Sequence, residues 1–139
     1  KVLVVGGGMV GCEAAEYLAE RGHEAAVIEM KDVIAADVTP ENRRYMFANF
    51  EEHHVLLRPS AKVSQFYPDG VDYTLADGTA GSLRGYDNVV LAMGSRSNAV
   101  LKETAEKVAP QVFVIGEAAK APGNAVLATH DALEAALQI

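Results

Sequence analysis

The sequence has a single cysteine, no tryptophan and fewer basic than acidic side chains. Cys12 is the only cysteine among 139 residues, so no disulfide can form within them, and we expect a reducing, cytoplasmic compartment. Twelve Lys and Arg against 19 Asp and Glu give a formal net charge of −7, and the basic residues nowhere cluster. This balance argues against a nucleic-acid partner and against binding to an anionic membrane surface.

Long apolar runs and processing signals are also missing. No stretch approaches the roughly 20 apolar residues that span a bilayer, so we expect no membrane partner. Lys1 leads directly into a strand-like run without a signal-peptide pattern. The absence of an initiating Met predicts a fragment of a longer chain. Half of the residues are hydrophobic, which suits one globular domain over residues 1–139.

A strand–helix–strand pattern opens the chain. The continuous apolar run Val2–Val5 predicts a parallel strand buried on both faces. Residues Met9–Arg21 have helical spacing, and Gly22 is placed to end that helix in a left-handed conformation. Ala25–Glu29 then predicts a second strand. The expected inner face of the helix consists of Gly11, Ala14, Ala15 and Leu18.

Gly6, Gly8 and Gly11 form the pattern GxGxxG between the first strand and the helix. Gly6 would permit the tight turn, Gly8 the approach of a pyrophosphate to the backbone, and Gly11 close packing of the helix on the sheet. The unpaired amides of the helix start suit a diphosphate. Glu29 follows Gly6 by 23 residues and is placed to bind ribose hydroxyls. The alternative is a structural glycine turn with an incidental glutamate.

Glu29 also bears on the choice of nucleotide. A carboxylate accepts hydrogen bonds from the ribose hydroxyls of NAD or FAD but repels the 2′-phosphate of NADP. Lys31, Arg43 and Arg44 could reverse that preference if they approached the ribose. We expect them to be solvated surface charges, which favours NAD over NADP.

The remaining pattern predicts an α/β fold with a mostly parallel central sheet and a peripheral antiparallel meander. Residues Gly94–Ala109 mix polar residues with a short helix, and we place any linker or lid there. The other expected elements are a helix opened by Thr39 and Pro40 and ending near Glu52, strands at Val55–Leu57, Ala61–Phe66, Val71–Leu75 and Thr79–Leu83, buried strands in NVVLAMG and QVFVIGE, and a helix over Asn124–Leu137.

Other reactive side chains do not form a recognisable catalytic or metal site. His53 and His54 are adjacent and point in different directions, so they form no helical metal pair. His130 and Asp131 suit a helix surface better than acid–base catalysis, and Ser95 lacks the flanking pattern of a nucleophile. Cys12 is expected to be a small buried residue. We therefore predict no metal and no catalytic side chain.

The segments VVGGGMVGCEAAEYLAERGHEAAVIEM, NRRYMF, NVVLAMGSRSN and VFVIGEAAK resemble the pyridine-nucleotide-binding region of flavoproteins with two dinucleotide-binding domains. The resemblance covers essentially the whole chain. It is greatest to the NADH:flavin oxidoreductases related to 2,4-dienoyl-CoA reductase, 2-enoate reductase and trimethylamine dehydrogenase. It implies a three-layer, Rossmann-like FAD/NAD(P)-binding fold.

The same resemblance implies further contact residues. Ala92, Met93 and Gly94 match a family segment that passes close to the bound nucleotide. VFVIGE resembles the segment whose acid contacts the flavin, with Glu117 in place of the usual Asp. The residues expected at cofactors are Gly6, Gly8, Met9, Val10, Gly11, Glu29, Met30, Lys31, Ala92, Met93, Gly94, Gly116 and Glu117.

The resemblance implies an NAD(P)H-binding domain that presents nicotinamide for hydride transfer to flavin within a larger oxidoreductase. FAD would be bound by the full-length enzyme, and FMN and an iron–sulfur cluster by domains outside this sequence. The isolated chain would then be catalytically incomplete. Residues 111–139 would belong to the FAD domain or complete the local sheet. The alternatives are an FAD-binding domain of the same class and a non-catalytic nucleotide-binding module.

Overall fold

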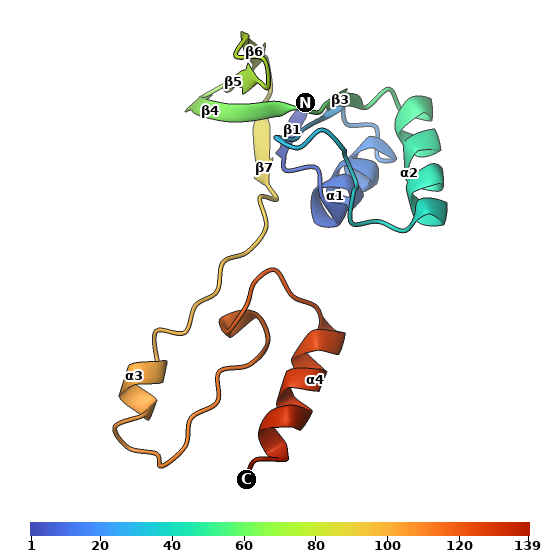
Figure 1. Ribbon diagram of the computed structural model, residues 1–139. Helices are drawn as coiled ribbons and strands as arrows, with labels where there is room; N and C mark the ends of the chain where they lie inside the picture. Colours follow the sequence, from blue (N-terminus) through green and yellow to red (C-terminus); the bar gives the residue numbers. More distant parts are fainter. The chain divides into compact units, whose positions relative to one another are not determined.

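The computed structural model describes all 139 residues and divides into two compact units, Lys1–Met93 and Gly94–Ile139 (Figure 1). The first unit is built on a four-stranded parallel sheet with the strand order β3-β2-β1-β7. Its strands are β1 (Val2–Val5), β2 (Ala25–Ile28), β3 (Leu56–Arg58) and β7 (Asn88–Leu91).

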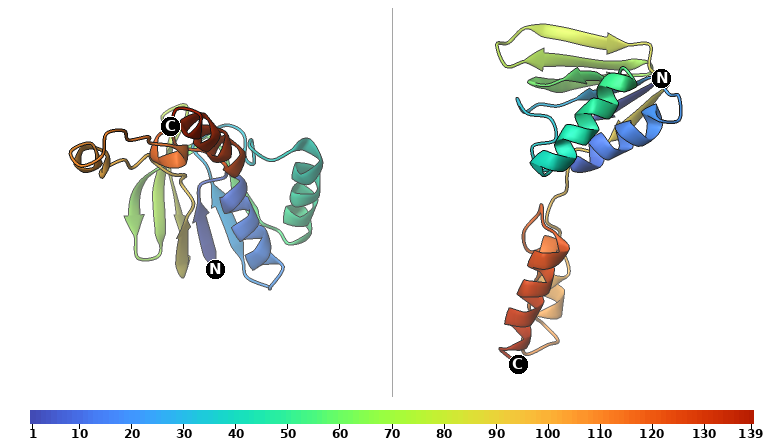
Figure 2. Two further views of the ribbon diagram at one scale, coloured as in Figure 1. Left: turned by 90° about the horizontal axis from the view of Figure 1, so that it is seen from below. Right: turned by 90° about the vertical axis from the view of Figure 1, so that its right-hand side faces the viewer.

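Three layers make up the first unit. Helices α1 (Met9–Ala19) and α2 (Pro40–Glu52) cover one face of the parallel sheet. An antiparallel meander covers the other face, as the right-hand view of Figure 2 shows. The meander consists of β4 (Ala61–Tyr67), β5 (Gly70–Leu75) and β6 (Ala80–Arg84). The predicted α/β fold with a mostly parallel sheet and a separate meander is confirmed.

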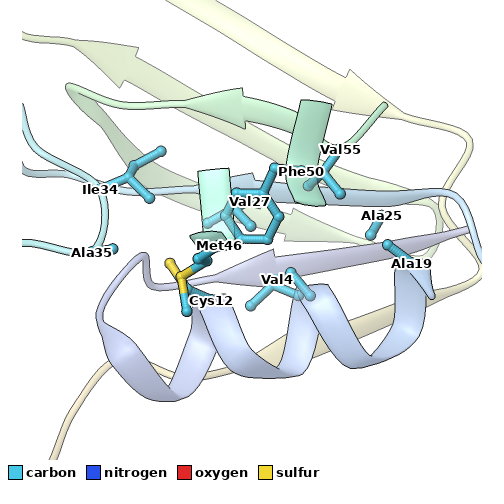
Figure 3. Close-up of a cluster of buried hydrophobic side chains, with 11 residues drawn as sticks. Val4, Cys12, Ala19, Ala25, Val27, Ile34, Ala35, Met46, Phe50 and Val55 are labelled. Carbon is cyan, nitrogen blue, oxygen red and sulfur yellow. The ribbon is translucent and has the colours of Figure 1, made fainter. Parts of the chain in front are cut away.

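The continuous apolar runs of β1 and β2 follow from burial on both faces. Successive side chains of a strand point to opposite faces. Val4 and Val27 therefore pack with the helices, whereas Leu3 and Ile28 pack with the meander. Figure 3 shows the helix-side cluster, which combines Val4 and Val27 of the sheet with Met46 and Phe50 of α2.

Helix α1 is two residues shorter than predicted, and its buried face is rotated. Cys12 and Ala19 are buried in place of the expected Ala14 and Leu18, which are only partly covered. Gly22 has φ +82° and its amide donates to Ala19 O, while the amide of His23 donates to Leu18 O. These two bonds form a Schellman C-cap, so the predicted left-handed helix end is confirmed.

The bounds of the other first-unit elements lie close to the expected ones. Helix α2 begins at Pro40 with Thr39 as N-cap, and its buried residues are Met46 and Phe50. Strand β3 is shifted by one residue, because Val55 donates to Phe50 O and closes the helix end instead of joining the sheet.

The second unit contains little regular structure. Its elements are α3 (Lys102–Ala105), the 3₁₀ helix η1 (Gly116–Ala118) and α4 (Ala125–Ala136). None of its residues is buried. The predicted strand in QVFVIGE is wrong: residues 111–115 pair with no strand, and the parallel sheet ends at β7. An apolar run becomes a strand only where a neighbouring strand accepts its hydrogen bonds. No helix of either unit combines the length and apolar character needed to cross a membrane.

Candidate nucleotide-binding site

The three motif glycines lie at the corner where β1 passes into α1, and two of them permit close contacts. Gly6 has φ +111°, and a Cβ built there would lie 2.2 Å from Ala92 O at the end of β7. A Cβ on Gly11 would lie 1.9 Å from Gly6 O. Side chains at either position would therefore force the helix, the turn and β7 apart. The close approach of Gly6 and Gly11 agrees with the predicted tight turn and close helix packing, and the contact of Gly6 with Ala92 is an additional finding.

The backbone amides of this corner differ in their partners. Gly6 N donates to Ile28 O over 2.9 Å, which fixes the turn to the end of β2. Met9 N donates to both carboxylate oxygens of Asp37, at 2.9 and 3.1 Å. The amides of Gly8, Val10 and Gly11 donate to no acceptor within the chain. Three amide donors at a helix start, with its partial positive charge, are suited to an anion.

Glu29 is buried at the end of β2, with 9% of its surface exposed. One carboxylate oxygen accepts from Gly7 N at 2.6 Å and the other from Lys31 N at 2.8 Å. Each oxygen retains a further lone pair for another donor. Glu29 therefore fixes the glycine turn against the strand end while its carboxylate stays able to accept further bonds.

Gly7 makes a close contact that the motif analysis did not assign. A Cβ at this position would lie 2.8 Å from Glu29 Cβ. The signal in the sequence is that Gly7 is the middle one of three consecutive glycines, but GxGxxG leaves that position open. Asp37 was also missed. It lies in the irregular segment after β2, where neither a period nor a motif distinguishes it from a solvated acid.

The basic residues near Glu29 have separate environments. Arg43 Nε donates to Ile34 O at 3.0 Å, and its guanidinium lies 4.4 Å from the centre of the Phe47 ring. Arg44 and Lys31 are exposed, as is Met30. The expected surface position is thus observed for Lys31 and Arg44, whereas Arg43 is held by α2 and the preceding segment.

The predicted residues after β7 fall on both sides of the division between the units. The backbone amide of Ala92 donates to Val5 O at 2.8 Å, and the Ala92 side chain packs against the helix-side core. Met93 is exposed and ends the first unit, and Gly94, with φ +82°, begins the second.

Gly116 and Glu117 lie within the second unit. Gly116 N donates to Asp131 Oδ2 at 3.0 Å. Glu117 Oε1 accepts from Gly123 N at 2.8 Å and from Ser95 Oγ at 3.0 Å. The Gly123 amide, and after it the Ser95 hydroxyl, lower the pKa of the Glu117 carboxyl below its usual range. Glu117 is therefore an anion that organises the loop around η1.

Cys12 and the histidines add no redox or metal chemistry to this arrangement. Burial is the main cause that raises the pKa of the Cys12 thiol, to about 11, and its Sγ lies 3.4 Å from Gly7 O. The thiol is thus protonated at neutral pH and packs as a small core residue, as predicted. No group of three or more His, Cys, Asp and Glu side chains is arranged to hold a metal ion.

Comparison with known proteins places this geometry in a family. The profile of the pyridine nucleotide-disulphide oxidoreductase family matches residues 1–132. An NADH oxidase of Thermoanaerobacter brockii is 36% identical over the whole chain, and a bilirubin reductase of Mediterraneibacter gnavus is 38% identical over 84% of it. The chain spans about a fifth of these relatives, 21% and 18% of their lengths.

Solved structures show the same fold. A 2-naphthoyl-CoA reductase matches 99% of the chain with a TM-score of 0.80 and 29% identity, over 21% of its own length. Histamine dehydrogenase from Rhizobium sp. 4-9 matches the fold of the whole chain with a TM-score of 0.81 at 19% identity, over 23% of its own length. The chain therefore belongs to the pyridine nucleotide-disulphide oxidoreductase family, whose members bind FAD and NAD(P).

Proposed function

We propose that the first unit binds NADH and presents its nicotinamide to a flavin held by other parts of a longer oxidoreductase. Within the family, we assign the chain to the NADH:flavin oxidoreductases related to 2,4-dienoyl-CoA reductase, 2-enoate reductase and trimethylamine dehydrogenase. The relatives include an NADH oxidase and a bilirubin reductase, each about five times as long as this chain. The nicotinamide supplies a hydride, and the protein supplies position and electrostatics.

The single observation that carries this proposal is the set of amides at the start of α1. Gly8, Val10 and Gly11 donate to no acceptor within the chain. Gly8 also lacks a side chain that would separate a ligand from the backbone. A diphosphate offers several acceptor oxygens and two negative charges, and therefore satisfies both the amides and the helix dipole. These residues fit a dinucleotide.

The position of Glu29 favours NADH over NADPH. Its carboxylate lies 2.6 Å from Gly7 N, at the end of the strand beside the glycine turn. There it would accept from the adenosine ribose hydroxyls and repel a 2′-phosphate. Arg43 is committed to Ile34 O and the Phe47 ring, which leaves Lys31 as the exposed cation nearest in sequence. A single exposed lysine attracts a 2′-phosphate less strongly than the buried carboxylate of Glu29 repels it.

The chain's own residues bind and orient the nucleotide and do not take part in bond breaking. Ala92 and Met93, beyond β7, would form the wall beside the cofactor. Met30 and Lys31 would flank the adenosine. Gly116 and Glu117 lie within residues 111–139 of the second unit, and we assign these residues to the flavin-binding part of the parent protein. The exposed apolar residues of helix α4 and its C-cap favour packing of this segment against another part of a longer chain; they include Val126, Leu127, Leu133 and Leu137.

Titration of the purified chain with NADH, NADPH and FAD tests the proposal. We expect saturable binding of NADH, with NADPH weaker and FAD weaker still. In Gly8→Ala, the added Cβ would enter the space next to the backbone, and its three nearest heavy atoms would all belong to the exposed Asp37 carboxylate, the closest 3.3 Å away. We expect NADH affinity to fall about tenfold, which corresponds to about 1.4 kcal/mol, with an unchanged melting temperature.

Glu13→Ala is the matched control, because Glu13 is exposed on the same helix. Its NADH affinity should equal that of the wild type. No saturable NADH signal would overturn the proposal. Preferential FAD binding, with visible flavin absorbance of the complex, would assign the site to a flavin. NADH binding without electron transfer to a flavin-bearing parent domain would indicate a non-catalytic nucleotide module.

A further inference from the structure

The segment between β2 and α2 lies across the glycine turn and is fixed there by two buried residues. Ile34 and Ala35 are 4% and 0% exposed. Ala35 N donates to Gly7 O at 2.6 Å, and Ala35 has φ +55°, a left-handed conformation that alanine rarely adopts. The backbone at this point is therefore determined by its contact with the glycine turn.

Asp37 follows this anchor by two residues and places its carboxylate at the start of α1. Both oxygens contact Met9 N, at 2.9 and 3.1 Å. Oδ2 also lies 3.3 Å from the point that a Cβ of Gly8 would occupy. The carboxylate thus lies against Gly8, whose amide is proposed to bind the diphosphate, and it accepts from the amide of Met9, the next residue of the same helix start. Asp37 itself is exposed and has no other hydrogen-bond partner.

We propose that Asp37 is a resident anion that competes with the diphosphate of the dinucleotide for the amide of Met9. This inference rests on the proposed function of the first unit. One N–H cannot be donated fully to a carboxylate and to a phosphate oxygen at once, and two like charges within a few ångströms repel each other. Nucleotide binding therefore requires the Asp37 side chain to leave Met9.

The geometry restricts this movement to a few residues. Ile34 and Ala35 are buried, so the anchor stays in place, and Thr39 and Pro40 begin α2. Only residues 36–38 lie between them. Since Asp37 is exposed, its side chain can rotate into solvent without opening the core. Asp37 is thus a latch: its carboxylate accepts from the Met9 amide when no nucleotide is bound and leaves that amide when one binds.

Calorimetric titration with NADH and with ADP, at low and high salt, tests the latch. Asp37→Ala removes the acceptor, and Asp37→Asn removes the charge and keeps the shape. We expect both variants to bind NADH and ADP roughly three- to tenfold more tightly than the wild type, the scale of one charge at a helix start. The gain should shrink at high salt, because salt screens repulsion between exposed charges.

Asp32→Asn is the matched control, because Asp32 is an exposed acid in the same segment without a contact to the glycine turn. It should bind like the wild type. Melting temperatures identify any variant that is poorly folded, and Asp37→Asn serves as the second test if Asp37→Ala is affected. Unchanged or weaker binding in folded Asp37 variants would overturn the latch and leave the proposed function intact. If neither the wild type nor the variants bind NADH or ADP, the proposed function fails.

Discussion

At the scale of single residues, Glu29 connects the fold to the proposed site. Its carboxylate accepts from Gly7 N on one side and from Lys31 N on the other. The backbone of Glu29 is itself held by β3, since Glu29 N donates to Arg58 O at 2.9 Å. A carboxylate held in this way fixes the conformation of the glycine turn whether or not a ligand is bound. The residue that is proposed to recognise ribose is therefore also a structural residue.

Replacing Glu29 by glutamine tests both roles. A glutamine side chain has only one oxygen, so either Gly7 N or Lys31 N would face an NH₂ group and lose its acceptor. Because the site is buried, we expect Glu29→Gln to lower the free energy of unfolding by about 1–3 kcal/mol. We also expect the preference for NADH over NADPH to decrease. Urea denaturation and paired titrations measure these two effects.

Glu13→Gln provides the control, because Glu13 is exposed and makes no side-chain hydrogen bond or ion pair. It should leave both stability and nucleotide preference unchanged. A stable Glu29→Gln chain that still prefers NADH as strongly as the wild type would contradict the assignment of Glu29 to the ribose.

At the scale of elements, the C-terminal end of α1 shows how one glycine determines where a helix stops. Gly22 has φ +82° and no heavy atom within 4 Å of a Cβ built on it. A side chain there would therefore meet no steric obstacle from its surroundings. The only cost is the left-handed backbone, which is unfavourable for residues with a Cβ.

We expect Gly22→Ala to lower the free energy of unfolding by about 1 kcal/mol without altering NADH affinity. Gly22→Asn is the matched variant, because asparagine tolerates the left-handed conformation better than alanine does. Thermal unfolding of the two variants should rank asparagine between glycine and alanine. Equal stability of all three chains would show that the C-cap contributes nothing at this position.

The elements of the first unit were predictable because local and tertiary signals agree there. Val2–Val5 is apolar throughout and is in fact covered on both faces, and Gly22 ends α1 in the left-handed conformation. Helix α2 begins at Pro40 as predicted, although the Thr39 side chain makes no capping hydrogen bond. The interior face of α1 was predicted less well. The helical period identifies the buried face of α1 to within about one residue. Packing against α2 then determines that Cys12 is fully buried, whereas Leu18 is only partly buried.

Features that depend on a distant partner could not be predicted in this way. The apolar run in QVFVIGE has the composition of a strand but pairs with no strand. Asp37 lies 28 residues from Met9 along the chain, and nothing in its neighbours indicates that it returns to the glycine turn. Both cases require knowledge of which segments meet, which the local pattern does not contain.

At the scale of the whole molecule, the apolar core is distributed unevenly along the chain. Both hydrophobic clusters, one on each face of the parallel sheet, consist of residues from the first unit. All buried residues lie between Val2 and Tyr73. The second unit has no buried residue, although its helix α4 carries several apolar side chains. The two units therefore differ in how much apolar burial holds each of them together.

This difference predicts that a chain ending at Met93 folds without the second unit. Burial of apolar surface is the main favourable contribution to folding, and the first unit contains all of it at full burial. Each proposed contact of the diphosphate and the adenosine ribose also lies before Met93. We therefore expect residues 1–93 to unfold cooperatively and to bind NADH with an affinity within about twofold of that of the full chain. Circular dichroism melting and calorimetric titration of the two chains, measured side by side, check this. An unfolded short chain would mean that residues 94–139 contribute directly to the stability of the first unit. A folded short chain that no longer binds NADH would mean that these residues contribute to its binding site.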